Sequence, residues 1–137
     1  TSSNGIYYLQ RFVDCEGQGY SDIRVFVVFG QAIAAMRRRG TSWLNNVARG
    51  ASCEEIKLDS ELARIAINAT QALSMDYAGV DIIKDSQGQY SIIEVNSIPA
   101  WKGLESVCNI NIAELLANDL IGRCIQHNKE TINSAVS

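Results

Sequence analysis

The sequence predicts an α+β fold, with an antiparallel sheet and helices packed on one face. Short runs of bulky and β-branched residues, separated by turn-forming residues, are typical of strands joined in hairpins. Two longer segments repeat apolar residues at the spacing of amphipathic helices. The order along the chain is strand, hairpin, loop, helix, hairpin, helix, which favours a single sheet with helices beside it.

Composition and charge exclude several classes of protein. The 137 residues suffice for one domain with its own core, and 47% apolar with 20% charged residues excludes a disordered or collagen-like chain. The net charge of -3 provides no cationic field for nucleic acid or an anionic membrane. No apolar run is long enough to span a membrane, and the first residues lack the features of a signal peptide. We therefore expect a cytoplasmic protein without nucleic-acid or membrane partners.

The strands in the first half are predicted from apolar runs between turn signals. Residues 6–13 are rich in bulky side chains and end at the turn-forming segment 14–19. Residues 22–29 and 32–39 form the next two apolar runs, and the two residues between them indicate a hairpin. The segment 40–53 has no regular period and is expected to be a long loop, which in compact domains tends to be functional.

The second half is expected to hold two helices around a second hairpin. Residues 59–75 carry apolar residues at helical spacing after a capping carboxylate or hydroxyl. Strand-like runs at 77–84 and 89–95 flank residues 85–88, whose composition is typical of a hairpin turn. Helical spacing returns at about 111–126, which predicts a last helix followed by a polar tail.

Three oxygen-bearing side chains in the second hairpin form a candidate metal site. Glu94 and Asn96 are two residues apart on one strand and share a face. If Lys84 pairs with Gln89, Asp81 lies on that face as a diagonal neighbour of Glu94, with Cα atoms roughly 7 to 8 Å apart. Such oxygen ligands suit Mg²⁺ or Mn²⁺. The alternative is a solvated face of the sheet, on which the same charges cost little.

Three consecutive arginines end the second strand of the first hairpin. With a two-residue turn, Asp22 faces Arg39 and Arg24 faces Arg37, while Arg38 points to the other side. A slip of one residue would exchange these faces, and the sequence leaves the register open. Two opposed arginines favour a phosphate or carboxylate between them. A solvated edge strand, protected by its charges from aggregation, is an equally common cause of strand arginines.

Five segments resemble, in order and spacing, the carboxyl-terminal half of the RimK-like ATP-grasp ligases. Together they cover nearly the whole chain. They are Tyr8-Leu9-Gln10-Arg11-Phe12-Val13, Asp22-Ile23-Arg24-Val25, Asn46-Val47-Ala48-Arg49-Gly50, Ala78-Gly79-Val80-Asp81 and Glu94-Val95-Asn96-Ser97-Ile98-Pro99.

The resemblance implies an ATP- and Mg²⁺-dependent ligase that joins a carboxylate to an amine through an acyl phosphate. It further implies that glutamate or a similar amino acid is added to a protein tail or to a small cofactor, such as a pterin-type cofactor. The partners are then a small-molecule amino acid and a carboxylate acceptor. The acceptor, the amino acid and the formation of a homo-oligomer stay open. The alternative is a non-catalytic nucleotide-binding or assembly module with the ATP-grasp fold.

The resemblance also implies roles for individual residues. Asp81, Glu94 and Asn96 match ligands of two Mg²⁺ ions that bridge the phosphates of ATP. Arg38 matches a catalytic arginine that faces the phosphate and acyl groups. The positions that match the nucleotide-binding residues are Gln10, Arg11, Phe12, Asp22, Leu44, Asn45 and Asn46.

By this resemblance, residues 1–137 form the carboxyl-terminal part of an ATP-grasp domain. Its hinge strand is expected at about 6–13 and its metal-binding hairpin at about 77–96. Phosphate-binding lysines and a glycine-rich loop belong to an amino-terminal lobe in that family, and this lobe is absent from the chain. We therefore expect such a lobe upstream of Thr1, and expect the isolated chain to be inactive.

Overall fold

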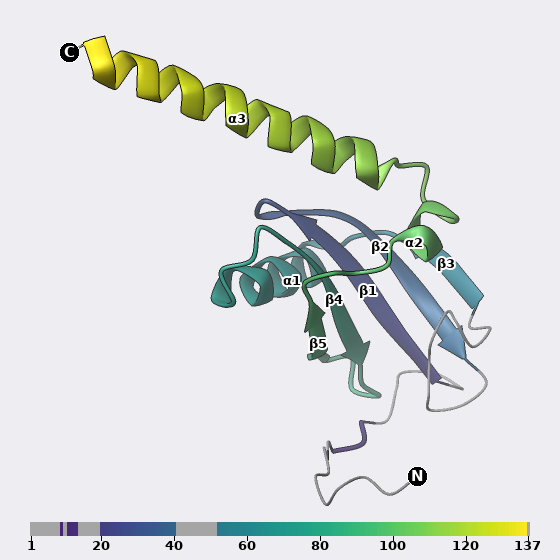
Figure 1. Ribbon diagram of the computed structural model, residues 1–137. Coiled ribbons are helices and arrows are strands. Elements are labelled where there is room, and N and C mark those ends of the chain that lie inside the picture. The colour runs from purple at the N-terminus through teal and green to yellow at the C-terminus, as the bar shows by residue number, and fades with distance from the viewer. Residues whose placement is uncertain (1–8, 10, 14–19, 41–51, 137) are drawn as a thin grey trace, which may run out of the picture.

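The computed structural model describes residues 9, 11–13, 20–40 and 52–136 of the chain. Within these ranges, one antiparallel sheet has the strand order β3-β2-β1-β4-β5, so the predicted α+β class is confirmed (Figure 1). The strands are β1 (Tyr20–Val28), β2 (Gln31–Gly40), β3 (Ser52–Ile56), β4 (Tyr77–Lys84) and β5 (Tyr90–Asn96). The helices are α1 (Ser60–Ala72), α2 (Lys102–Glu105) and α3 (Ile112–Val136).

The predicted first hairpin is confirmed, but its turn lies one residue earlier than expected. Phe29 and Gly30 connect β1 to β2, and both have positive φ, at 46° and 76°. Positive φ at both positions is the conformation of a type I′ turn, whose twist matches that of the strands it joins. Phe29 is held in this conformation by its N–H, which donates to the Asp76 carbonyl at 2.6 Å, and by Arg123, whose guanidinium lies 3.2 Å from the ring centroid.

A bulge then changes the register of this hairpin. Phe26 pairs with Ala34, whereas Val27 pairs with Ala32, so Ile33 is the extra residue on β2. Such a bulge shifts every pairing beyond it by one residue.

The earlier turn and the bulge together decide which arginine faces the central strands. Asp22 lies opposite Arg38, and the expected pairings of Asp22 with Arg39 and of Arg24 with Arg37 are wrong by one residue. The structure therefore takes the register in which the faces are exchanged. Because side chains alternate along a strand, Arg38 shares a face with Asp22, whereas Arg37 and Arg39 point to the opposite face.

The second hairpin is also as predicted, with two departures in pairing. Lys84 pairs with Tyr90 instead of Gln89, because the turn is one residue longer than expected. A register shift between Asp81 and Ile82 then adds a second residue, so Asp81 lies directly opposite Glu94. Each shift of one residue exchanges the two faces of the strand, so two shifts return each side chain to its predicted face. The carboxylates of Asp81 and Glu94 therefore share a face, as the sequence predicted.

Helices cover both faces of the sheet, whereas the sequence predicted them on one face. The central strands β1 and β4 have buried residues at successive positions, so both of their faces need cover. On the first face, α1 packs on strand residues through Leu62 and Ala66, against Val25, Val27, Val80 and Ile82. On the second face, Leu104 of α2 and Ile112 of α3 pack against Phe26, Val28, Ala34 and Met36.

The bounds of the helices differ from the predictions in identifiable ways. α1 begins after Asp59, which caps it as expected, but ends at Ala72 because Ser74 has a φ of 52° that a helix cannot continue. The strand β3 and the short helix α2 are not predicted by the sequence pattern. The segment after residue 126, expected to be a polar tail, continues α3 instead.

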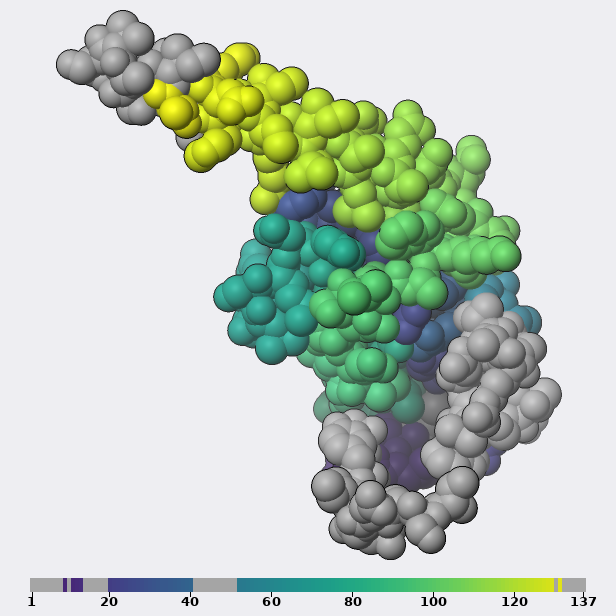
Figure 2. Space-filling model, in the orientation of Figure 1, coloured from purple at the N-terminus to yellow at the C-terminus, as the bar shows by residue number. Residues whose placement is uncertain are grey.

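The apolar contacts of α3 with the sheet come from its first turns, and Arg123, in a later turn, lies over the Phe29 ring. Asn111 accepts from the Glu114 N–H at 3.0 Å, and Glu105 accepts from the Ile112 N–H at 2.9 Å, so the helix begins at a well-capped end. Further along, the helix stands clear of the sheet (Figures 1 and 2), and Leu120, Ile121 and Ile125 are exposed. Among the described residues, no helix has the length and apolar character that a membrane span requires.

The predicted strand at 6–13 and the turn at 14–19 lie mostly outside the described residues. Leu9 and residues 11–13 are described, and they belong to no helix or strand. Most of the predicted loop at 40–53 also lies outside the described residues, although its end is part of β3.

Replacement of the α1 cap should destabilise the fold. Asp59 accepts from the Leu62 N–H at 2.7 Å, and this bond lowers the pKa of the carboxyl below its usual value. We expect Asp59→Ala to reduce the free energy of unfolding by about 1 kcal/mol at neutral pH, measured by urea denaturation. Because the pKa is lowered on folding, the difference from wild type should shrink as the pH falls below about 4. Ser60→Ala is the control, and an equal effect there would contradict the capping role.

Candidate functional site

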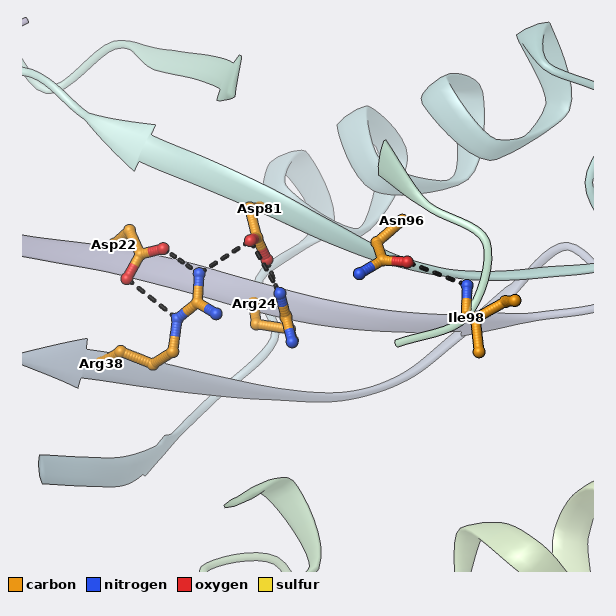
Figure 3. Close-up of polar contacts among 6 residues, drawn as sticks. All are labelled: Asp22, Arg24, Arg38, Asp81, Asn96 and Ile98. Atoms are coloured by element: carbon orange, nitrogen blue, oxygen red, sulfur yellow. Dashed lines mark hydrogen bonds and ion pairs between the residues drawn. The ribbon is translucent and has the colours of Figure 1, made fainter. Parts of the chain in front are cut away.

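Four side chains of alternating charge lie on the second face of the sheet, across β2, β1 and β4 (Figure 3). Asp22 and Arg24 are two residues apart on β1 and therefore share a face. The register places Arg38 opposite Asp22 on one side and Asp81 opposite Arg24 on the other. All four side chains are at most 11% exposed. We call this group the buried charge cluster.

The hydrogen bonds make the buried charge cluster continuous. Arg24 binds Asp81 with two parallel bonds, from Nε to Oδ1 at 2.7 Å and from Nη2 to Oδ2 at 2.8 Å. Arg38 binds Asp22 in the same manner, with its Nε 3.0 Å from Oδ1 and its Nη2 on Oδ2. The Nη2 atom of Arg38 also lies 2.8 Å from Oδ2 of Asp81. Arg38 is therefore shared between the two carboxylates.

Burial and pairing act in opposite directions on these groups. Burial raises the pKa of the Asp22 carboxyl, and the charge of Asp81 adds to this rise, whereas the bonds from Arg38 oppose it. Burial disfavours the charged form of Arg38, but the bond and charge of Asp22 and the charge of Asp81 outweigh this and raise the pKa of the guanidinium. Arg38 is thus held as a cation between two acids.

The three predicted metal ligands lie together at one end of the buried charge cluster. Asp81 on β4 is directly opposite Glu94 on β5, closer than the diagonal placement that the sequence predicted. Asn96 follows two residues later on the same face, and its Oδ1 accepts from the Ile98 N–H at 2.9 Å (Figure 3). Glu94 is exposed, whereas Asp81 is buried.

The chemistry of these donors fits a hard divalent cation. All three side chains present oxygen atoms, and Mg²⁺ takes a few carboxylate oxygens together with water and phosphate oxygens. Among the described residues, no group of three His, Cys, Asp or Glu side chains is placed to hold a metal ion. A cation here would therefore rely on the amide of Asn96 beside the two carboxylates.

The remaining predicted site residues are only partly described. Arg11 and Phe12 are exposed, and neither forms a hydrogen bond or ion pair with the buried charge cluster within the described part of the chain. Asp22 belongs to that cluster. The positions Gln10, Leu44, Asn45 and Asn46 lie outside the described residues.

Two residues of the site were not singled out by the sequence pattern. Arg24 binds Asp81, although the sequence suggested only an opposition to Arg37. Gly79 lies two residues before Asp81, and a Cβ there would be 2.6 Å from the Cβ of Pro99, so glycine is required where the chain after Asn96 crosses β4. The Asp-x-Arg spacing on a strand is the signal that places Asp22 and Arg24 on one face.

Comparison with known proteins defines the class of this site. Residues 2–120 match the RimK-like ATP-grasp domain. This chain therefore belongs to the RimK-like ATP-grasp family, as its sequence motifs indicated.

Curated relatives give a more specific similarity. The chain is 37% identical over 120 residues to a tetrahydromethanopterin:alpha-L-glutamate ligase of Methanococcus maripaludis, covering 88% of this chain and 41% of that protein. It is 38% identical over 117 residues to a probable alpha-L-glutamate ligase 2 of Hahella chejuensis, covering 84% of this chain and 38% of that protein. The chain thus spans about two fifths of the length of these relatives.

Solved structures share the fold. The ATP-grasp ligase PsnB in complex with a minimal precursor aligns with a TM-score of 0.66 at 24% identity, over 84% of this chain and 37% of PsnB. A structure of PsnB with minimal precursor, Mg and ADP aligns with a TM-score of 0.62 at 26% identity, over 75% of this chain and 32% of PsnB. The predicted ATP-grasp fold is therefore confirmed.

Loss of Arg38 should destabilise the protein far more than loss of its neighbour Arg39. Arg38→Ala leaves Asp22 buried without its cation and removes one partner of Asp81. We therefore expect the free energy of unfolding, measured by urea denaturation, to fall by about 3 to 5 kcal/mol. The Arg39 side chain is 50% exposed and pairs with Glu54 at 3.0 Å, so Arg39→Ala should change stability by less than about 1 kcal/mol. Equal effects would contradict the observed register.

Proposed function

We propose that this chain is the metal-bearing, carboxyl-terminal part of an ATP- and Mg²⁺-dependent ligase that joins a carboxylate to an amine. The observation that carries the proposal is the meeting of Asp81, Glu94 and Asn96 beside Arg38, on one face of the sheet, in a member of the RimK-like family. Within such a protein, the chain would act in the cytoplasm together with an amino-terminal lobe that carries further phosphate-binding groups.

In the proposed reaction, a carboxylate oxygen of the acceptor attacks the γ-phosphorus of ATP, and the bond to the leaving ADP oxygen breaks. The amine nitrogen then attacks the carbonyl carbon of the acyl phosphate, loses a proton, and phosphate leaves as the amide forms. Phosphoryl transfer of this kind depends mainly on positioning and on neutralisation of charge. Bound Mg²⁺, with Mn²⁺ as a substitute, supplies the neutralisation of the phosphate oxygens.

The side chains of this chain have separate proposed roles. Asp81, Glu94 and Asn96 hold the cation, and Arg38 presents its guanidinium to the transferred phosphoryl and the acyl group. Arg38 is suited to this role because it is held as a cation, and its positive charge would attract the phosphate oxygens. The nucleotide would contact Asp22 through its ribose and would also lie against Gln10, Arg11, Phe12, Leu44, Asn45 and Asn46.

The substrates are proposed from the relatives. Two of them are named as ligases of alpha-L-glutamate, one of which acts on tetrahydromethanopterin. We therefore infer that glutamate or a similar amino acid is added to a small cofactor of the pterin type or to a protein tail. The structure of PsnB in complex with a precursor peptide supports the second of these acceptors, the protein tail.

The proposal predicts Mg²⁺-dependent formation of ADP by the full-length protein in the presence of ATP, glutamate and an acceptor carboxylate. Glu94→Gln should reduce the rate by roughly 100-fold or more, because a metal ligand contributes several kcal/mol to the stabilisation of the transition state. The rate is measured by coupling ADP to the oxidation of NADH, and the ligated product by mass spectrometry.

Glu61→Gln provides the matched control for this experiment. Glu61 lies in the first turn of α1, which packs on the first face of the sheet, away from the proposed ligands. The Glu61→Gln variant should therefore form ADP at the wild-type rate. A wild-type rate with Glu94→Gln would show that the metal assignment is wrong. Binding of ATP without any turnover, across a panel of acids and amines, would instead favour the non-catalytic module.

A further inference from the structure

We propose that Arg24 is a positioning residue of the metal site. It orients the Asp81 carboxylate so that one defined oxygen lone pair is available to bind the cation. This inference rests on the proposed function, because it takes Asp81 as a metal ligand. It concerns a residue to which the family resemblance assigned no role.

The contact between Arg24 and Asp81 has the geometry of a rigid clamp. The two residues are directly opposite on β1 and β4, and both carboxylate oxygens receive a bond from the same guanidinium plane, at 2.7 and 2.8 Å. Paired, parallel bonds of this kind fix the rotation of the carboxylate as well as its distance. The side chains are 11% and 7% exposed, so water competes little for these bonds.

A count of lone pairs shows what the clamp leaves available. An ionised carboxylate offers about four lone-pair sites on its two oxygens. Arg24 takes one site on each oxygen, and Arg38 takes a second site on Oδ2 at 2.8 Å. From the described residues, then, Oδ1 of Asp81 keeps one lone pair. Asp81 would therefore bind a cation through Oδ1 alone, which suits the few, single-oxygen protein ligands of Mg²⁺.

The stem of Arg24 lies over β4 at Gly79, two residues before Asp81. Its Cδ lies 3.6 Å from the position that a Cβ on Gly79 would occupy, and the Pro99 Cβ lies 2.6 Å from that same position. Gly79 pairs with Asn96 across β4 and β5. Because residue 79 has no side chain, Arg24 and Pro99 both approach β4 at this point. Arg24 and the chain that follows Asn96 thus meet β4 at the same glycine.

An ion pair on the other face shows what a clamp without this role looks like. Arg39 binds Glu54 through Nε at 3.3 Å and Nη2 at 3.0 Å, but both bonds reach the same oxygen. Its side chains are 50% and 48% exposed. Arg39 therefore does not bind the second oxygen of Glu54 and does not fix the rotation of the Glu54 carboxylate. Arg39→Lys is therefore a matched control for Arg24→Lys.

The experiment is a Mn²⁺ titration of the full-length protein, with free Mn²⁺ measured by electron paramagnetic resonance. Lysine keeps the charge of Arg24 but cannot form the two-bond clamp. We expect Arg24→Lys to raise the Kd for Mn²⁺ by 10- to 100-fold, the usual effect of removing a group that orients a ligand. Arg39→Lys should leave the Kd within about twofold of wild type, as expected for an exposed pair.

Asp81→Asn separates failure of this inference from failure of the proposed function. If wild type and Asp81→Asn bind Mn²⁺ equally, the proposed metal site is wrong. If Asp81→Asn weakens binding but Arg24→Lys does not, only the role of Arg24 is overturned.

A crystal structure of the wild-type protein with Mn²⁺ tests the clamp without relying on the stability of a variant. It should show the metal on Oδ1 of Asp81 with both Arg24 bonds kept. Departure of Arg24 from Asp81 in the metal-bound state would overturn the inference.

Discussion

The buried charge cluster, which consists of Asp22, Arg38, Asp81 and Arg24, constrains the register of the central strands more than any other interaction. A charge taken out of water costs several kcal/mol unless it is paired with good geometry, and each member here is paired on neighbouring strands. A slip of one residue in either β1–β2 or β1–β4 would turn some of these charges to the other face and leave their partners buried alone. The pairing therefore acts together with the apolar core in setting the register of three strands.

The buried charge cluster also divides the second face of the sheet into a polar and an apolar region. Along β1, Asp22 and Arg24 are followed on that face by Phe26 and Val28, which pack with α2 and the beginning of α3. The helices cover the apolar region, and the polar region is framed by the β4–β5 hairpin and the chain around Asn96 (Figure 3). The fold thus places an apolar core and the buried charge cluster on the same face of one sheet.

Most of the fold was accessible from the sequence because its signals are local. The periodicity that predicted α1 and the turn chemistry that predicted both hairpins involve residues close together in the chain. β3 and α2 were missed because they are short and depend on neighbours, β3 on pairing with β2 and α2 on packing of Leu104 against the sheet. Helices were expected on one face, although residues 25–28 of β1 are apolar at successive positions, a pattern typical of a strand buried on both faces.

For the candidate site, the sequence by itself determined the family motifs, the residue types and the common face of Asp81, Glu94 and Asn96. That common face survived because the two register changes in the second hairpin add up to an even number of residues. In the first hairpin, the earlier turn and the bulge at Ile33 together shift the pairing by one residue from the prediction. An odd shift exchanges the faces, so Arg38 lies at the site instead of Arg37. The family resemblance had assigned Arg38 to the site, but only the tertiary structure decided the register that brings it there, and with it the clamp of Arg24 on Asp81. The physical reason is that a bulge and a turn of positive φ are set by the packing of whole strands, whereas side-chain alternation is a property of the chain alone.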